Sequence, residues 1–130
     1  MAAMFDLTGR KALVTGGATG IGEGIALGLA AAGADVALTY RSHAPDRVLT
    51  KIEGMGRKAA AVQADFAGMD AAAAGGVVDF AADALGGLDI LVNNAGIIHR
   101  EDSADLALEN WRRVLSVNLD SVWLLSQAAR

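Results

Sequence analysis

The sequence predicts an α/β protein with a doubly wound parallel sheet and helices on both of its faces. Short apolar segments typical of buried strands alternate with helical segments along the chain, and the first of them runs directly into a glycine-rich turn. The composition agrees, because 53% of residues are hydrophobic but only 5% are aromatic, which suits close packing of helices on a sheet. Four successive strand–helix units with right-handed crossovers predict the strand order 3-2-1-4.

The first strand and the first helix lie on either side of the glycine-rich turn. Residues 11–15 are a short apolar run of strand-forming residues, typical of a buried parallel strand. The helix that follows ends at a C-cap, Gly33. Its apolar residues recur at four-residue spacing beside a second stripe of small residues, which predicts close contact with the sheet: Ile21, Ile25 and Leu29, then Gly24, Gly28 and Ala32.

The second and third units continue this alternation. Residues 35–40 and 58–64 predict strands, and each is followed by a helix. Pro45 begins one helix, and Asp70 is the expected N-cap of the other. Glycines end both helices, and their expected buried faces are Val48, Ile52 and Met55 in the first and Ala73, Val77, Phe80 and Ala84 in the second.

The last strand, residues 88–92, contains an apolar triplet that suits a strand with neighbours on both sides. In the order 3-2-1-4 it is the outer strand unless more chain follows, and no Gly or Pro ends the last helix before Arg130. We therefore expect residues 1–130 to form one domain that is a fragment of a longer one. The last helix begins near Glu109, and its predicted stripe is Trp111, Val114, Asn118, Val122 and Leu125.

Composition excludes several classes of function. The absence of cysteine excludes disulfides, thiolate metal sites and a cysteine nucleophile, and two histidines without a second ligand at helical spacing predict no metal site. A net charge of −4 without a basic stripe predicts no nucleic-acid partner. No charge-free stretch is long enough to span a bilayer, and the amino-terminal residues lack the order of a signal peptide, so we expect a cytoplasmic protein with no membrane partner.

The turn after the first strand has the pattern Thr-Gly-x-x-x-Gly-Ile-Gly over residues 15–22. Gly16 permits a tight turn, Gly20 leaves the backbone bare for a pyrophosphate, and Gly22 has no side chain where the helix meets the strand. The helix N-terminus adds free N–H groups and a partial positive charge. Glu23 stands where a P-loop requires lysine, which excludes a standard nucleotide hydrolase. The turn therefore predicts Rossmann-like binding of a dinucleotide.

Three further features follow this turn in order: Asp65 after the third strand, Asn93-Asn94-Ala95-Gly96 after the fourth, and Asn118 in the last helix. With them the sequence resembles the classical short-chain dehydrogenases/reductases from about residue 7 to its end. The resemblance implies NAD(P)-dependent hydride transfer to or from the carbonyl/alcohol pair of a small-molecule substrate. It also implies that the full-length form is a homo-oligomer assembled partly through the helix that holds Asn118.

The resemblance and the positions of the strand ends together suggest roles for individual residues. Asn118 is the one implied catalytic residue in this chain, where it would bend its helix and hold a water in a proton relay. Asp65 would accept a hydrogen bond from the adenine amino group, whereas Asn93 and Asn94 are equally well explained by bracing of the turn backbone. The expected cofactor-binding residues are Gly16, Gly20, Ile21, Gly22, Tyr40, Arg41, Asp65, Phe66, Asn93, Ala95 and Gly96.

The end of the second strand bears on the choice of cofactor. An acidic residue there would accept a hydrogen bond from the ribose 2′-hydroxyl and repel a 2′-phosphate, whereas a cation would pair with that phosphate. Tyr40 takes the acidic position and Arg41 follows it, so NADP(H) is favoured and NAD(H) stays possible. A solvated loop charge is the alternative explanation of Arg41.

The proton-transfer residues of the resembled family, a Ser and a Tyr followed four residues later by Lys, are not found in this sequence. Its only tyrosine is Tyr40, with no lysine four residues later, so we expect the 130-residue chain to bind cofactor without turnover.

Residues 95–102 and 110–128 resemble the sugar-acid branch of the family, which includes 2-deoxy-D-gluconate 3-dehydrogenase and 2-dehydro-3-deoxy-D-gluconate 5-dehydrogenase. His99 and Arg100 could meet a substrate carboxylate, and a solvated surface loop is the alternative. Two other functions stay open. One is a 3-oxoacyl-carrier-protein reductase or glucose dehydrogenase with the same amino-terminal half, and the other is a non-catalytic dinucleotide-binding module.

Overall fold

The computed structural model describes residues 4–130 and contains a four-stranded parallel sheet in the order β3-β2-β1-β4. The predicted fold class and strand order are therefore confirmed. Residues 1–3, used above in the argument against a signal peptide, lie outside the described residues. The strands are β1 (Lys11–Val14), β2 (Asp35–Tyr40), β3 (Ala59–Gln63) and β4 (Ile90–Val92).

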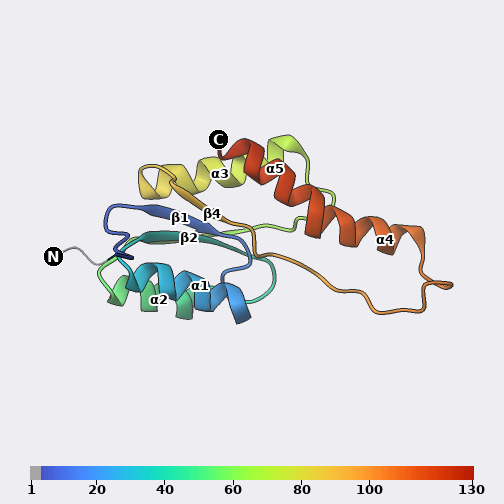
Figure 1. Ribbon diagram of the computed structural model, residues 1–130, viewed down its shortest axis with the longest axis horizontal. Helices are drawn as coiled ribbons and strands as arrows, with labels where there is room; N and C mark the ends of the chain where they lie inside the picture. The colour runs from blue at the N-terminus through green and yellow to red at the C-terminus, as the bar shows by residue number, and fades with distance from the viewer. Residues whose placement is uncertain (1–3) are drawn as a thin grey trace.

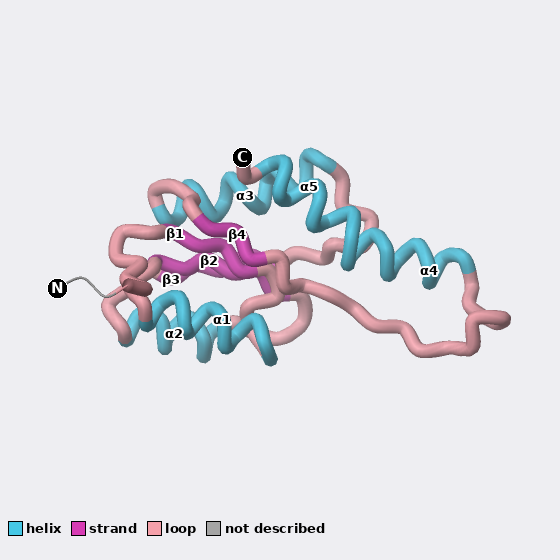
Figure 2. Tube along the Cα trace, in the orientation of Figure 1, coloured by secondary structure: helices cyan, strands magenta, loops and turns pink. Residues whose placement is uncertain are grey.

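The helices cover both faces of this sheet, as Figures 1 and 2 show. Helices α1 (Gly20–Ala31) and α2 (Asp46–Gly54) lie on one face, and α3 (Ala71–Leu85) and α5 (Ser121–Ala128) lie on the other. Helix α4 (Leu108–Leu115) extends beyond the sheet and has no buried residue. A wider π-helical turn, η1 (Ser116–Asp120), joins α4 to α5. None of the helices in residues 4–130 combines the length and apolarity that a membrane crossing requires.

The sheet separates two apolar clusters because side chains alternate between its faces. Leu13 and Ala37 belong to the cluster under α3 and α5. Val14, Val36 and Leu38 belong to the cluster under α1 and α2. All five are fully buried, so the central strands β1 and β2 provide a rigid base from which the loops at their carboxyl ends leave the sheet.

Helix α1 packs on the sheet through a different face from the one predicted. Its buried residues are Gly22, Ala26 and Ala30, whereas Ile21 is 78% exposed and both Gly24 and Gly28 are exposed. The line of contact with the sheet is occupied by the smallest side chains because they allow the closest approach. Ile25 and Leu29 flank that line and are only half-buried. The predicted stripe was therefore wrong, although the close packing it implied is present.

The next two helices confirm part of what was predicted for them. Val48 and Ile52 are buried, but Met55 is 43% exposed because the helix has already ended at Gly54. Asp70 is the N-cap of α3, and its Oδ1 accepts a hydrogen bond from the Ala73 amide at 2.8 Å. Ala73 and Ala84 are exposed and Phe80 is half-buried, because the buried face of α3 is centred on Ala74, Val77, Val78, Ala81 and Leu85.

The predicted stripe of the last helix is interrupted by the π-helical turn. Trp111 is 53% exposed and Asn118 is exposed, whereas Val117, Ser121 and Leu125 are buried. A π-helical turn accommodates an extra residue, which rotates the following side chains about the axis relative to a regular helix. The exposed large apolar residues on this side are Leu108, Trp111, Leu119 and Trp123. They lie on the helix through which assembly was expected, and assembly itself stays a prediction.

Candidate functional site

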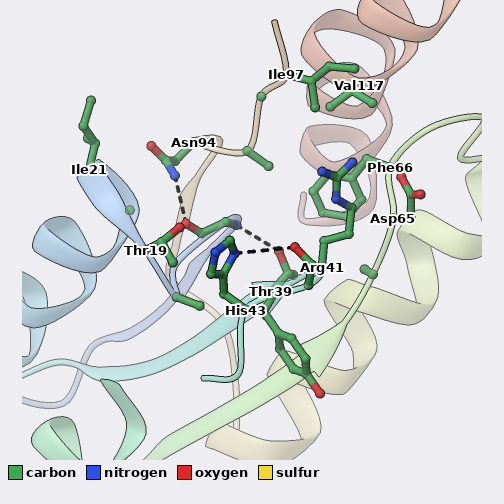
Figure 3. Close-up of a pocket in the computed structure, with 18 residues that line it drawn as sticks. Thr19, Ile21, Thr39, Arg41, His43, Asp65, Phe66, Asn94, Ile97 and Val117 are labelled. Atoms are coloured by element: carbon green, nitrogen blue, oxygen red, sulfur yellow. Dashed lines mark hydrogen bonds between the residues drawn. The ribbon is translucent and has the colours of Figure 1, made fainter. Parts of the chain in front are cut away.

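A cleft of about 380 Å³ lies at the carboxyl edge of the sheet, where the loops leave the four strands (Figure 3). In doubly wound parallel sheets this edge is the usual place for a ligand. Most of the expected cofactor residues line the cleft: Gly16, Ile21, Gly22, Tyr40, Arg41, Asp65, Phe66, Ala95 and Gly96. Figure 3 shows Ile21 and Asn94 on one side of it and Arg41 and Asp65 on the other.

Three expected site residues are not among those that line the cleft: Gly20, Asn93 and Asn118. Asn93 turns toward α5, where its Nδ2 donates a hydrogen bond to Ser126 Oγ at 3.2 Å. His99, a candidate for substrate contact, also lies outside the lining, and its Nε2 is 3.2 Å from Glu101 Oε1. Asn94, considered above for bracing the turn, also lines the cleft. The remaining lining residues were not predicted from the sequence: Ala18, Thr19, Thr39, Ser42, His43, Ala64, Ile97 and Val117.

Two of the missed positions had a signal in the sequence. Thr39 is the next-to-last residue of β2, where a hydroxyl can serve the neighbouring turn, and it is 2% exposed. His43 follows Arg41 by two residues in the loop that leaves the same strand. The other missed residues are apolar or small, and their place depends on packing that no local pattern shows.

The glycine turn requires glycine for two different reasons, a backbone conformation and a close approach. Gly16 has φ +64° and Gly20 has φ +58°, a region that side-chain-bearing residues rarely adopt. Gly22 is required for a different reason, since a Cβ built there would lie 2.1 Å from the Gly16 carbonyl oxygen and 2.4 Å from Asn94 Nδ2. The first turn of α1 can approach β1 and the loop after β4 only because residue 22 has no side chain.

Thr15 joins the turn after β1 to the loop after β4. Its buried Oγ1 accepts hydrogen bonds from the amides of Asn94 at 3.0 Å and Ala95 at 2.9 Å. In return, Asn94 Nδ2 donates to the carbonyl oxygens of Thr15 at 3.0 Å and Gly16 at 3.2 Å. Asn94 therefore braces the glycine turn, one of the two roles considered for it.

The end of β2 is held to the turn and to β3. The Gly16 amide donates to Thr39 Oγ1 at 3.0 Å, and the Gly17 amide donates to the Thr39 carbonyl at 3.0 Å. Gln63 Nε2 donates to the Arg41 carbonyl at 2.9 Å, which fixes the backbone where the Arg41 side chain enters the cleft. A cation is thus presented at the end of β2 by an anchored backbone.

The amino end of α1 supplies the opposite wall. Its N-cap is Thr19, whose side chain makes no capping hydrogen bond, and Thr19, Ile21 and Gly22 all line the cleft. The first N–H groups of a helix lack partners within the helix and carry a partial positive charge. This wall is therefore suited to an anion such as a phosphate.

Asn118 lies in the π-helical turn and holds the chain that follows β4. Its Oδ1 accepts from the Ile97 amide and its Nδ2 donates to the Ile97 carbonyl, both at 2.8 Å. Ile97 lines the cleft. The amide of Asn118 therefore fixes one edge of the cleft without lining it. Among the described residues 4–130, no group of three or more His, Asp or Glu side chains could hold a metal ion.

These features define a doubly wound α/β protein with an anion-accepting cleft at the carboxyl edge of its sheet. The family model for short chain dehydrogenases matches residues 10–130, and the chain belongs to that family.

Three similar proteins place it within the family. The 2-dehydro-3-deoxy-D-gluconate 5-dehydrogenase of Bacillus subtilis is 44% identical over 127 residues, covering 96% of this chain and 48% of that relative. A 3-oxoacyl-[acyl-carrier-protein] reductase of Synechocystis sp. is 39% identical over 127 residues, and the match covers 96% of this chain and 51% of that relative. The crystal structure of a Burkholderia cenocepacia short chain dehydrogenase in complex with NADP is 51% identical with a TM-score of 0.90, covering 95% of this chain and 50% of that one. The chain thus spans about half the length of the curated relatives it matches.

Proposed function

We propose that this chain binds NADP(H) in the cleft at the carboxyl edge of the sheet. The observation that carries the proposal is the joint placement of the glycine turn, the amino end of α1 and the Arg41 side chain around one cleft. The helix end would receive the pyrophosphate, and Arg41 would pair with the 2′-phosphate. Asp65, on the same side as Arg41, would accept from the adenine amino group. The similar Burkholderia protein was crystallised with NADP, which supports this choice.

Replacement of Arg41 tests the cofactor preference. We expect Arg41→Ala to weaken NADPH binding by about tenfold or more and to leave NADH binding nearly unchanged, because only NADPH carries the 2′-phosphate. Fluorescence titration with each nucleotide measures both affinities. Arg112→Ala is the control, since Arg112 is exposed on α4 and does not line the cleft. An equal loss for NADPH and NADH would contradict the assigned role of Arg41.

We further propose that the whole protein transfers hydride between the nicotinamide and a carbonyl/alcohol pair of a sugar acid. The name of the similar Bacillus subtilis relative supports this substrate class. The Synechocystis relative keeps a 3-oxoacyl reductase as the second candidate. Assay of the whole protein with a 2-dehydro-3-deoxy sugar acid and with a 3-oxoacyl thioester separates the two, since the preferred substrate should show the higher kcat/KM.

We propose that Asn118 contributes to this reaction by holding in place the segment that follows β4. Because both polar atoms of its amide hold Ile97, Asn118→Ala should release that edge of the cleft. We expect hydrogen exchange at the Ile97 amide to rise at least about tenfold, since its protecting acceptor is lost. Ser116→Ala, in the same π-helical turn, is the control. Unchanged exchange at Ile97 in Asn118→Ala would show that the loop is held by other contacts.

A further inference from the structure

Glu23 places a negative charge at the helix end that is to receive a phosphate. It is the one acidic residue in the first turn of α1, directly after Gly22 of the glycine turn. Its side chain is 18% exposed, and its Oε1 is buried and, apart from an ion-pair contact with Arg47, makes no hydrogen bond within the described part of the chain. The carboxylate therefore depends on a neighbouring charge for its compensation.

That compensating charge comes from the next helix. Arg47 lies in the first turn of α2, and its Nη2 is 2.5 Å from Glu23 Oε1. The side chain of Arg47 is 62% exposed and does not line the cleft. Arg47 is thus placed to cancel the charge of Glu23 without reaching a ligand in the cleft itself.

The two anions would otherwise compete for the same positive helix end. A carboxylate in the first turn interacts favourably with the helix dipole, as does a bound phosphate. Two like charges within one helical turn repel each other, and the repulsion is felt most when the carboxylate is shielded from water and salt. An ion pair with Arg47 removes most of that repulsion while the carboxylate stays at the helix end.

We propose that Arg47 is a positioning residue for dinucleotide binding, which it supports by neutralising Glu23 beside the pyrophosphate subsite. The inference rests on the proposed function, since it requires a phosphate at the amino end of α1. It differs from the role of Arg41 in one respect: the pyrophosphate is common to both nucleotides, so loss of Arg47 must weaken NADH and NADPH equally.

A double-mutant cycle on this chain tests the proposal. We expect Arg47→Ala to weaken NADPH and NADH binding by about fivefold at low ionic strength, with a smaller effect at high ionic strength. Arg47→Lys, which keeps the charge, should restore most of the affinity. Glu23→Gln combined with Arg47→Ala should bind within about twofold of the unmodified chain, because the uncompensated charge is gone. Thermal unfolding of each variant establishes that it is folded.

The possible outcomes separate the competing explanations. If the double variant binds as weakly as Arg47→Ala, Arg47 contacts the ligand directly and the proposal is overturned. If Arg47→Ala binds both nucleotides normally, the ion pair is only structural, which overturns it as well. If the unmodified, folded chain binds neither nucleotide, the proposed function itself fails, and the inference fails with it.

Discussion

Gly22→Ala is expected to abolish measurable nucleotide binding and to lower the free energy of unfolding by about 3 kcal/mol. The added methyl group would lie 2.1 Å from the Gly16 carbonyl oxygen, a backbone atom that cannot rotate out of the way. Relief requires that α1 move away from β1, and the same movement displaces the Asn94 side chain, which would be 2.4 Å from the new methyl. The turn and the helix end that form one wall of the cleft would therefore shift together.

Gly24→Ala is the matched control for this substitution. Gly24 lies two residues further along α1, and a Cβ built there would meet no atom within 4 Å other than those of its chain neighbours and of the surrounding helix backbone. Alanine favours a helix over glycine by about 1 kcal/mol, so this variant should be slightly more stable and should bind nucleotide normally. Urea unfolding and fluorescence titration compare the two. Normal binding by Gly22→Ala would show that the turn tolerates a side chain and that the close approach is not essential.

The sequence predicted the order of elements and the glycine turn because both depend on local patterns. Buried parallel strands are continuous apolar runs, and a turn with positive φ requires glycine, so residues 11–15 and Gly16 were identifiable without knowledge of the fold. Gly22 was also identifiable, because its spacing from Gly16 places it where helix and strand meet.

The buried faces of the helices were harder to predict because packing decides them. In α1 the sheet contacts the smallest residues, such as Ala26, and leaves the larger Ile21 exposed. The spacing of large apolar residues predicts the opposite, that Ile21 is buried and that Ala26 is not on the buried face. In the last helix the π-helical turn around Asn118 changes the helical phase. The resemblance implies a bend at Asn118, and a polar side chain interrupts the apolar stripe there, but apolar spacing alone does not show which residues turn inward after the bend.

Some features of the cleft could be predicted from local sequence order, and others depend on contacts formed only in the folded sheet. Arg41 and Asp65 follow strands directly, so their place at the carboxyl edge could be inferred from order alone. The sequence identifies Thr15 only as the end of a strand and the start of a motif, although its hydroxyl bonds to Asn94, 79 residues further along the chain. Such a link becomes visible only when β1 and β4 are neighbours in the sheet.

That hydroxyl leads to the second large expected effect. Thr15→Val keeps the shape of the side chain but removes the acceptor for the amides of Asn94 and Ala95. Thr15 is 1% exposed, so water cannot readily replace the hydroxyl. An unsatisfied buried N–H group costs about 1–3 kcal/mol, and because Asn94 and Ala95 are only half-buried, the two amides together predict a loss of about 2 kcal/mol in the free energy of unfolding. The midpoint of urea unfolding should fall with an unchanged slope.

Thr15→Ser distinguishes the hydroxyl from the rest of the side chain. Serine retains the acceptor and loses one methyl group, so we expect a loss of only about 1 kcal/mol and nearly normal nucleotide binding. Thr15→Val should also weaken binding, because the loop after β4 would no longer hold Asn94 against the Gly16 carbonyl. The opposite result would be a free energy of unfolding for Thr15→Val equal to that of Thr15→Ser. It would mean that the amides of Asn94 and Ala95 find other acceptors. The Asn94 side chain alone would then join the glycine turn to the loop after β4.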